Sequence, residues 1–275
     1  PAGESGHNIG RATAVLMGWN QVPGVTVNRY CSSSLMTIRM AAHAIKAGEG
    51  DCFIAAGVET VSRYANGASD MAPNAIFKGP GERTKLRSQG GQGTWTAPEG
   101  LPDMYIAMGQ TAENVVEIEG ISREDMDRFG VRSQNLACAH VDNGFFEREI
   151  TPLTLEDGTV VSKDDGPRPG TNYGAVSQLK PVFRPDGTVT AGNACPLNDG
   201  AAALVIMSDT KAKELGLTPL ARIVATAATG LSPDQVETTL DAAVTAEDDN
   251  EGDWLLQLFG GGEPAPQEKP TSSLD

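Results

Sequence analysis

The sequence predicts an α/β fold, and three features of residues 1–66 support this. Val25–Asn28 is short and rich in β-branched residues, as strands are. Apolar residues then recur at helical spacing from Ser32 to Ala47, and the apolar run Cys52–Gly57 follows. Because a strand, a helix and a strand in this order form a βαβ unit, a sheet covered by helices is expected.

The helix expected at 32–47 has one apolar face and a clear end. The face consists of Leu35, Ile38, Ala42 and Ile45. Gly48 is placed to end the helix, since glycine readily adopts the left-handed conformation that closes helices. The run Cys52–Gly57 lacks polar residues, which is typical of a strand buried on both faces.

The middle of the chain has a different composition. Residues 67–103 are dominated by Gly, Pro and polar residues and are expected to form a long loop. A helix is expected from about Pro102 to Glu119. A second helix is expected from Ser122, which opens a capping-box-like SRED phrase, to about Asp142.

After residue 188 the α/β pattern returns and then fades. Ala201–Met207 is expected to form a buried strand and Ala221–Ala228 another strand, and Asp209–Leu215 is an expected helix closed by Gly216. From Leu231 onward eleven acidic residues face a single lysine, which accounts for ten of the fifteen excess negative charges. That composition predicts disorder, with residues 254–259 as the one short apolar element.

Composition also limits the function. The net charge of −15 disfavours nucleic acid and anionic membranes as partners. No apolar run approaches the roughly 18 residues that a membrane span needs, and the first residues do not resemble a signal peptide. Four scattered cysteines without CxxC pairs argue against a metal site and a disulfide framework, and favour the reducing cytoplasm.

Cys31 is the candidate nucleophile. It lies between an expected strand and the first turn of an expected helix, where unpaired backbone N–H groups and the helix dipole stabilise a thiolate. A thiolate attacks thioester carbonyls readily, and the small residues Ser32, Ser33 and Ser34 leave room for a substrate. By position alone, a buried structural cysteine is the alternative.

Four phrases, in order, resemble the thiolase family. They are VNRYCSSSL at 27–35, AAGVETVS at 55–62, MGQTAEN at 108–114 and TAGNACPLNDGAA at 190–202. The resemblance extends over about residues 1–230. It implies that Cys31 is the acyl-carrying cysteine of the family.

The resemblance also implies an architecture. The family has a duplicated core of α-β-α layers with a loop domain inserted in its first half, and this chain is expected to hold the N-terminal half without its opening strands and to lack most of the second half. The expected parts are the first core segment 1–66, the insertion 67–187, the returning core 188–216, the start of the second core 217–230, and the tail 231–275.

The implied activity is acyl transfer between coenzyme A and Cys31, with no covalently bound cofactor. The acyl group would come from acyl-CoA or a cleaved 3-ketoacyl-CoA and pass to CoA in thiolysis, or to a second acetyl-CoA in condensation. The implied contacts of coenzyme A are Met108, Ala191, Gly192, Asn193 and Cys195. Cys195 stands where many members have serine, and Ala107 where some have histidine.

Three later family motifs do not occur in these 275 residues: Gly-His-Pro, Cys-x-Gly and Asn-Glu-Ala-Phe. His43 cannot replace the missing base by hydrogen bonding, since it is 12 residues beyond Cys31, about 18 Å along a helix. Truncation or a shifted reading frame would explain the missing motifs. Two alternatives therefore stay open: an incomplete chain that at most binds acyl-CoA, and a ketosynthase-like condensing enzyme.

Two further expectations concern partners. Family members form dimers or tetramers through the strand near Val25–Asn28, so a homodimer or homotetramer is implied. Basic residues of the insertion are candidates for phosphate contact, with a solvated face as the alternative. They are Lys78, Arg83, Lys85 and Arg87.

Overall fold

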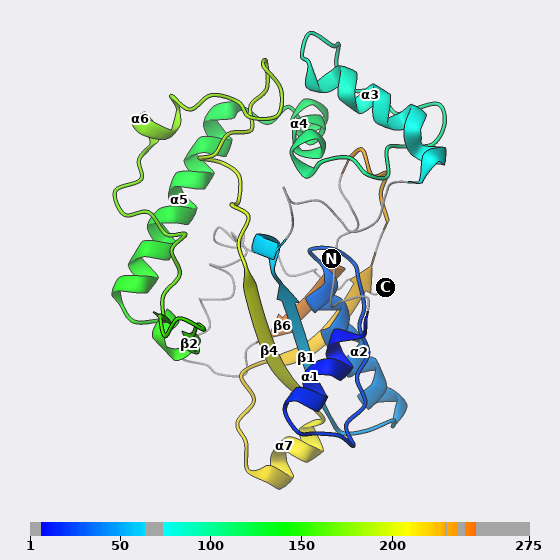
Figure 1. The fold of residues 1–275 in the computed structure, drawn as a ribbon, viewed down its shortest axis with the longest axis vertical. Helices are drawn as coiled ribbons and strands as arrows, with labels where there is room; N and C mark the ends of the chain where they lie inside the picture. Colours follow the sequence, from blue (N-terminus) through cyan, green and yellow to red (C-terminus); the bar gives the residue numbers. More distant parts are fainter. Residues whose placement is uncertain (1–6, 64–73, 229, 236–239, 246–275) are drawn as a thin grey trace, which may run out of the picture. The chain divides into compact units, whose positions relative to one another are not determined.

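The computed structural model describes residues 7–63, 74–228, 230–235 and 240–245 and confirms a mixed α/β protein (Figure 1). The chain divides into two compact units. Unit 1 comprises the described residues within 1–28, 58–202 and 229–239. Unit 2 comprises those within 29–57, 203–228 and 240–275.

Unit 1 is mainly helical. Its helices are α1 (Ile9–Leu16), α3 (Lys78–Ser88), α4 (Met108–Glu119), α5 (Arg123–Asp142) and α6 (Tyr173–Val176). Short 3₁₀ turns occur at Val61–Arg63, Ala75–Phe77 and Phe146–Arg148. A small antiparallel hairpin joins β2 (Leu153–Thr154) to β3 (Val160–Val161), with Leu153 opposite Val161.

The long helices α4 and α5 of unit 1 both end where the sequence predicts, and α5 also has the predicted Ser122 as its N-cap. The Ser122 side chain accepts a hydrogen bond from the Asp125 N–H at 3.0 Å, which caps α5. Gly120 closes α4 in the left-handed conformation, with φ of 65°. α4 begins at Met108 rather than near Pro102, so the predicted start was six residues early.

Unit 2 contains the helices α2 (Ser33–Ala47) and α7 (Asp209–Leu215). It also contains two whole strands, β5 (Arg222–Ala228) and β6 (Leu240–Thr245), and the larger part of two others, β1 (Cys52–Glu59) and β4 (Gly200–Met207). β1 is hydrogen-bonded to β4, and the two lie side by side in Figure 1. β5 pairs antiparallel with β6, with a register shift between Ile223 and Ala225.

The strand predicted at Val25–Asn28 is wrong. This segment has no strand structure, and its contacts are with the start of α1 instead. The Gly10 N–H donates to the Thr26 hydroxyl at 3.1 Å, and the Asn8 side chain donates to the Gly24 carbonyl at 2.9 Å. A strand requires a neighbouring strand's backbone, whereas here a helix terminus and side chains supply the partners.

The long loop predicted at 67–103 is wrong over α3. Pro80 stands in the first turn of this helix, where no backbone N–H is needed, so it does not disrupt the helix. The arginines of α3 also bind outside it: the Arg87 guanidinium contacts Glu117 of α4 at 2.8 Å. Tertiary contacts therefore override a composition that favours a loop.

The prediction that the strands β1 and β4 are buried is also wrong. Ile54 of β1 is 53% exposed, and Val205 of β4 is 61% exposed. Within the described residues, β1 and β4 form a sheet of only two strands, so no strand flanks them as in a wide sheet. Leu240–Thr245 form β6 where the sequence predicts disorder, and residues 254–259 lie outside the described residues.

No helix in the described ranges is both long enough and apolar enough to span a membrane.

Candidate functional site

Cys31 lies in a backbone elbow directly before α2. Ser32 is the N-cap of the helix, and the Cys31 side chain is exposed. The helix thus starts at Ser33, one residue later than predicted. The Ser33 N–H donates to the Tyr30 carbonyl at 3.0 Å, and the rest of the first turn, with the positive end of the helix dipole, follows the sulfur directly in sequence.

The elbow depends on Tyr30, which adopts a left-handed conformation with φ of 49°. This region is costly for a bulky residue, so surrounding bonds must hold it. The Ser33 hydroxyl donates to the Tyr30 carbonyl at 2.6 Å and accepts from the Arg29 N–H at 2.9 Å. The first helical side chain therefore fixes the turn that presents Cys31.

The other cysteines lack this setting. Cys52 is an exposed residue at the start of β1, Cys138 is half-buried in α5, and Cys195 is exposed in a loop. Among the hydrogen bonds of the described residues, none joins Cys31 to a histidine. His43 lies within α2, as the sequence predicts, and His140 packs against Phe145 with ring centroids 5.2 Å apart.

The predicted contacts of coenzyme A all belong to unit 1, whereas Cys31 belongs to unit 2. Met108 is the first residue of α4 and is 53% exposed. Ala191 and Cys195 are exposed in the segment that precedes β4. The structure brings Ala191, Gly192 and Asn193 together in one tight turn.

Asn193 uses its carboxamide to hold this turn. Its side-chain oxygen accepts from the Thr190 N–H at 2.7 Å, and its side-chain nitrogen donates to the Thr188 carbonyl at 3.0 Å. The same nitrogen donates to the buried carboxylate of Asp127 in α5 at 2.9 Å. These bonds give the side chain a structural function rather than leaving it open to a ligand.

Gly192 is required by packing. A Cβ there would lie 2.7 Å from Val176 and 2.8 Å from Leu179. On the opposite side, a Cβ on Gly130 of α5 would overlap the Gly192 carbonyl oxygen. The turn therefore lies directly against α5, and a larger residue at either position would displace it.

Sequence analysis missed a buried polar cluster on one face of α4. Its members from α4 are Gln110, Glu113, Asn114 and Glu117. The signal was present, because polar residues at i, i+3, i+4 and i+7 share one helical face. A polar stripe on a helix usually faces solvent, so this spacing alone does not predict burial.

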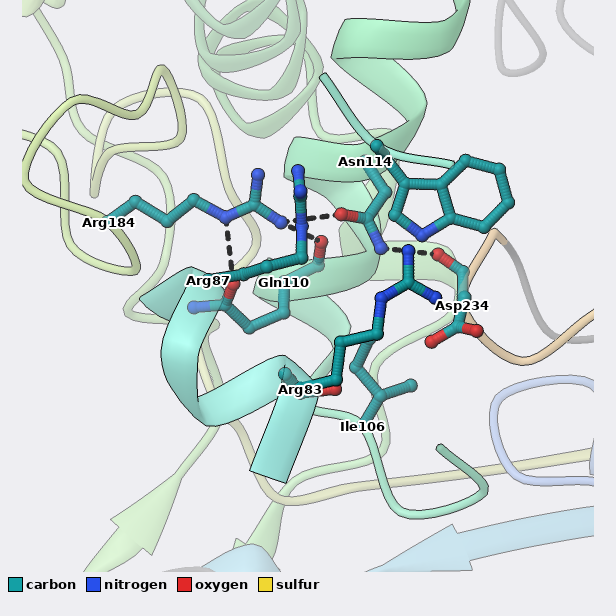
Figure 2. A pocket seen from close by; sticks show the side chains of 9 residues that line it. Arg83, Arg87, Ile106, Gln110, Asn114, Arg184 and Asp234 are labelled. Atoms are coloured by element: carbon teal, nitrogen blue, oxygen red, sulfur yellow. Dashed lines mark hydrogen bonds between the residues drawn. The ribbon is translucent and has the colours of Figure 1, made fainter. Parts of the chain in front are cut away.

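Arg184 lies at the centre of this cluster and is 6% exposed. Figure 2 shows its guanidinium between Gln110 and Asn114. It donates to the Gln110 side chain at 2.8 Å and to the Asn114 side chain at 2.5 Å, and forms an ion pair with Glu117. Burial, followed by the nearby Arg87 charge, lowers the pKa of Arg184, and the carboxylates of Glu117 and Glu113 oppose this.

A small pocket lies beside the cluster, between α3, α4 and the segment 231–235 (Figure 2). Asn114 donates to the Asp234 backbone carbonyl at 2.7 Å, which attaches that segment to α4. Among the described residues that line the pocket, two buried atoms have no hydrogen-bond partner: Arg87 Nε and Asp234 Oδ2. Burial is the main cause that raises the pKa of Asp234, with Asp103 adding to it and Arg83 opposing it.

In the predicted basic cluster at 78–87, both arginines bind other groups of the protein itself. Arg87 pairs with Glu117, and Arg83 donates to the Thr96 carbonyl and lies over the Trp95 ring at 5.9 Å. Lys85 lies 3.9 Å from Glu82, with both side chains largely exposed. The two arginines thus connect α3 to its surroundings. Within the described ranges, no cluster of three or more potential metal ligands occurs.

Comparison with known proteins agrees with the phrases around Cys31 and the 190–202 segment. Residues 1–210 match the family model described as thiolase, N-terminal domain. The chain is 42% identical over 241 residues to a beta-ketoadipyl-CoA thiolase of Acinetobacter baylyi, and 40% identical over 242 residues to an acetyl-CoA acetyltransferase of Pseudomonas aeruginosa. These alignments include 84% and 83% of this chain but only 58% of each relative.

Solved structures give the same result. The dimeric peroxisomal thiolase of Saccharomyces cerevisiae superposes with a TM-score of 0.69 at 31% identity, over 82% of this chain and 53% of that one. The acetyl-CoA acetyltransferase of Bacillus anthracis gives 0.65 at 37% identity, over 82% and 56%. The chain therefore spans little more than half of these relatives and belongs to the thiolase family, whose N-terminal domain it contains.

Proposed function

We propose that this chain supplies the acyl-accepting half of an acyl-CoA C-acyltransferase, with Cys31 as the nucleophile. The Cys31 sulfur attacks the thioester carbonyl carbon, the bond from that carbon to the coenzyme A sulfur breaks, and CoA leaves as the thiol with one proton. In condensation, the acyl group then passes to C2 of a second acetyl-CoA, which gives up one proton. In thiolysis, the Cys31 sulfur instead attacks the 3-keto carbon of a 3-ketoacyl-CoA, the bond from that carbon to C2 breaks, and acetyl-CoA leaves with one proton. Free CoA then takes the acyl group as a thioester and returns a proton to the Cys31 sulfur.

One observation supports this assignment above the others. Cys31 is the cysteine that combines exposure with a place directly before a 15-residue helix, in an elbow held by Tyr30 and Ser33. Family membership adds that the related proteins are named thiolases and acetyl-CoA acetyltransferases. It also favours thiolase chemistry over the ketosynthase alternative.

A second candidate function is binding of acyl-CoA without turnover. The observation that favours it is the 58% coverage of the relatives, together with the absence of the Gly-His-Pro and Cys-x-Gly motifs from these 275 residues. Binding of acyl-CoA with no acyl group transferred to Cys31 would be the signature of such a chain. An oligomer is a further expectation, since the solved relative from yeast is described as dimeric.

The test is site-resolved mass spectrometry after incubation with acetyl-CoA. The proposal expects one acetyl group on the peptide that contains Cys31, absent in Cys31→Ala and retained in Cys52→Ala, which removes another exposed thiol. Acetylation spread equally over the exposed cysteines would overturn it, as would a folded protein with no adduct. Calorimetry of acetyl-CoA binding separates the two candidates, because a chain that only binds takes up acetyl-CoA while the Cys31 peptide stays unmodified.

A further inference from the structure

We propose that Glu113 is a positioning residue for coenzyme A, one that fixes the turn at 190–193 against α4; this rests on the proposed function. The predicted contacts of coenzyme A come from two places in unit 1, the start of α4 and the segment 191–195. A ligand that uses both requires a fixed distance between them. Glu113 is the α4 side chain that binds the backbone leading into the turn.

The Glu113 carboxylate is buried, at 3% exposure, and accepts hydrogen bonds from three donors. Its Oε1 accepts from the Thr188 N–H at 2.9 Å and the Val189 N–H at 2.8 Å, and its Oε2 accepts from the Thr188 hydroxyl at 2.9 Å. Hydrogen bonds to a carboxylate are stronger than neutral ones and define the acceptor geometry closely. One α4 side chain therefore fixes two consecutive residues of the neighbouring segment.

Gly187 allows this approach. A Cβ at that position would overlap the Glu113 carboxylate and would lie 3.2 Å from the Arg184 Cβ. The glycine directly before Thr188 thus lets the backbone come close enough for both N–H groups to reach Glu113. The contact therefore depends on the residue type on both sides, on Glu113 in α4 and on Gly187 in the segment that faces it.

Further hydrogen bonds connect the segment that Glu113 binds to the turn at 190–193. The Thr188 carbonyl accepts from the Asn193 side chain at 3.0 Å, and the Asn193 side chain accepts from Thr190 N–H at 2.7 Å. The Gly192 N–H donates to the Thr190 hydroxyl at 3.2 Å. Asn193 and Gly192 are therefore held in place, while Ala191 remains exposed for contact with a ligand.

The experiment measures coenzyme A binding by titration calorimetry and Cys31 acylation with two donors, acetyl-CoA and S-acetyl-N-acetylcysteamine. The second donor carries the same thioester but lacks the nucleotide. Glu113→Gln keeps the side-chain size but replaces one acceptor oxygen by a donor. It is expected to weaken coenzyme A binding roughly tenfold or more and to slow acylation by acetyl-CoA to match, because small misplacements of binding groups are costly. Acylation by the short donor should stay at the wild-type rate.

Two matched sets of variants make the result specific. Thr188→Val removes one of the three donors and should give a smaller loss of the same kind, whereas Thr188→Ser keeps the hydroxyl and should restore wild-type binding. Glu119→Gln changes an exposed carboxylate on the same helix and should have no effect. If Glu113→Gln does not fold, the comparison of Thr188→Val with Thr188→Ser decides by the same measurements.

The inference is overturned if folded Glu113→Gln binds coenzyme A as the wild type does, or if both donors lose reactivity equally. It is also overturned if the wild type binds no coenzyme A. Failure of the proposed function looks different: coenzyme A binds and responds to Glu113→Gln, but Cys31 is not acylated by either donor.

Discussion

The two compact units differ in what they bury. In unit 1 the largest side chains with almost no exposure are all polar: Asn114, Thr111, Thr190 and Asp127. Among the described residues of unit 2, the buried apolar residues are alanines, Ala41, Ala42, Ala55 and Ala212, while several larger aliphatic side chains, among them Ile54, Leu204 and Val205, are exposed.

This difference shows how each unit is stabilised. A buried polar group contributes only when its partner is present, and leaving one unpaired costs about 1–3 kcal/mol. Along α4, unit 1 meets this condition within itself, since Gln110 and Glu113 bond to segments 70 or more residues away along the chain. Arg87 Nε and Asp234 Oδ2 are exceptions among the described residues of unit 1. Unit 2 carries an apolar strand face that its own described residues do not cover, and such faces usually meet another surface.

The largest effect on stability is expected from replacing Arg184, the cation at the centre of the buried polar cluster of unit 1. Arg184→Met should lower the free energy of unfolding by about 3 kcal/mol, because Glu117 and the two amides lose a buried partner. Urea denaturation measures this. Arg132→Met, at an exposed position of α5, is the matched control and should change the value little. Equal effects of the two substitutions would contradict the polar-core description.

A smaller effect is expected from crowding the same unit. Gly109→Ala places a methyl group against the Phe183 ring and should cost about 1–2 kcal/mol in thermal or urea unfolding. Gly81→Ala, in α3, meets no atom within 4 Å and should instead stabilise by about 0.5–1 kcal/mol. If Gly109→Ala were as benign as Gly81→Ala, α4 would not lie as close to Phe183 as described.

The pocket beside α4 should make stability depend on pH. Burial raises the pKa of Asp234, so ionising it is harder in the folded than in the unfolded chain. The contribution of Asp234 to stability is therefore complete below the ordinary aspartate pKa of about 3.9. It is lost as the pH rises through the raised pKa that Asp234 has in the folded chain. Asp234→Asn should raise the free energy of unfolding by on the order of 1 kcal/mol over the wild type at pH 7, and this difference should vanish near pH 3.

The pH dependence is read from urea unfolding of both proteins at several pH values. Arg83, Arg87 and Asp103 are the charged groups around this carboxylate, and they are unchanged in the variant. A stability difference that stays constant between pH 3 and 7 would show that Asp234 ionises as freely as in the unfolded chain.

The smallest effect on stability, but a visible one on association, is expected in unit 2. Val205→Thr keeps the shape of an exposed side chain of β4 and should shift the free energy of unfolding by less than about 0.5 kcal/mol. It should reduce self-association, measured by sedimentation velocity over a range of concentrations. A loss of stability well above that value would mean that Val205 is covered in solution.

The sequence predicted those elements whose signals are local. α2, α5, α7, β1, β4 and β5 lie where periodicity, caps and apolar runs place them. The errors lie where partners far along the chain decide the outcome. Val25–Asn28 has strand composition but bonds to α1, and α3 has loop composition but binds α4 through Arg87.

The candidate site divides in the same way. Cys31 could be proposed from its place before a helix and from the resemblance, whereas the left-handed Tyr30 that shapes the elbow carries no signal in a bulky side chain. The turn residues Ala191–Asn193 came from the resemblance alone. The supports of that turn, Glu113 and Asp127, are ordinary surface residues by composition, and their burial depends on contacts that only the folded chain creates.

The exposure of three free thiols, Cys31, Cys52 and Cys195, has a practical consequence. A colorimetric count of accessible sulfhydryls would give about the same total whether or not the elbow at Cys31 is intact. Samples kept without a reducing agent would also crosslink between molecules at any of the three positions. Enzymatic work on this chain therefore needs reagents that discriminate by reaction rate rather than by access, and Cys52→Ser with Cys195→Ser is the background in which the reactivity of Cys31 can be measured cleanly.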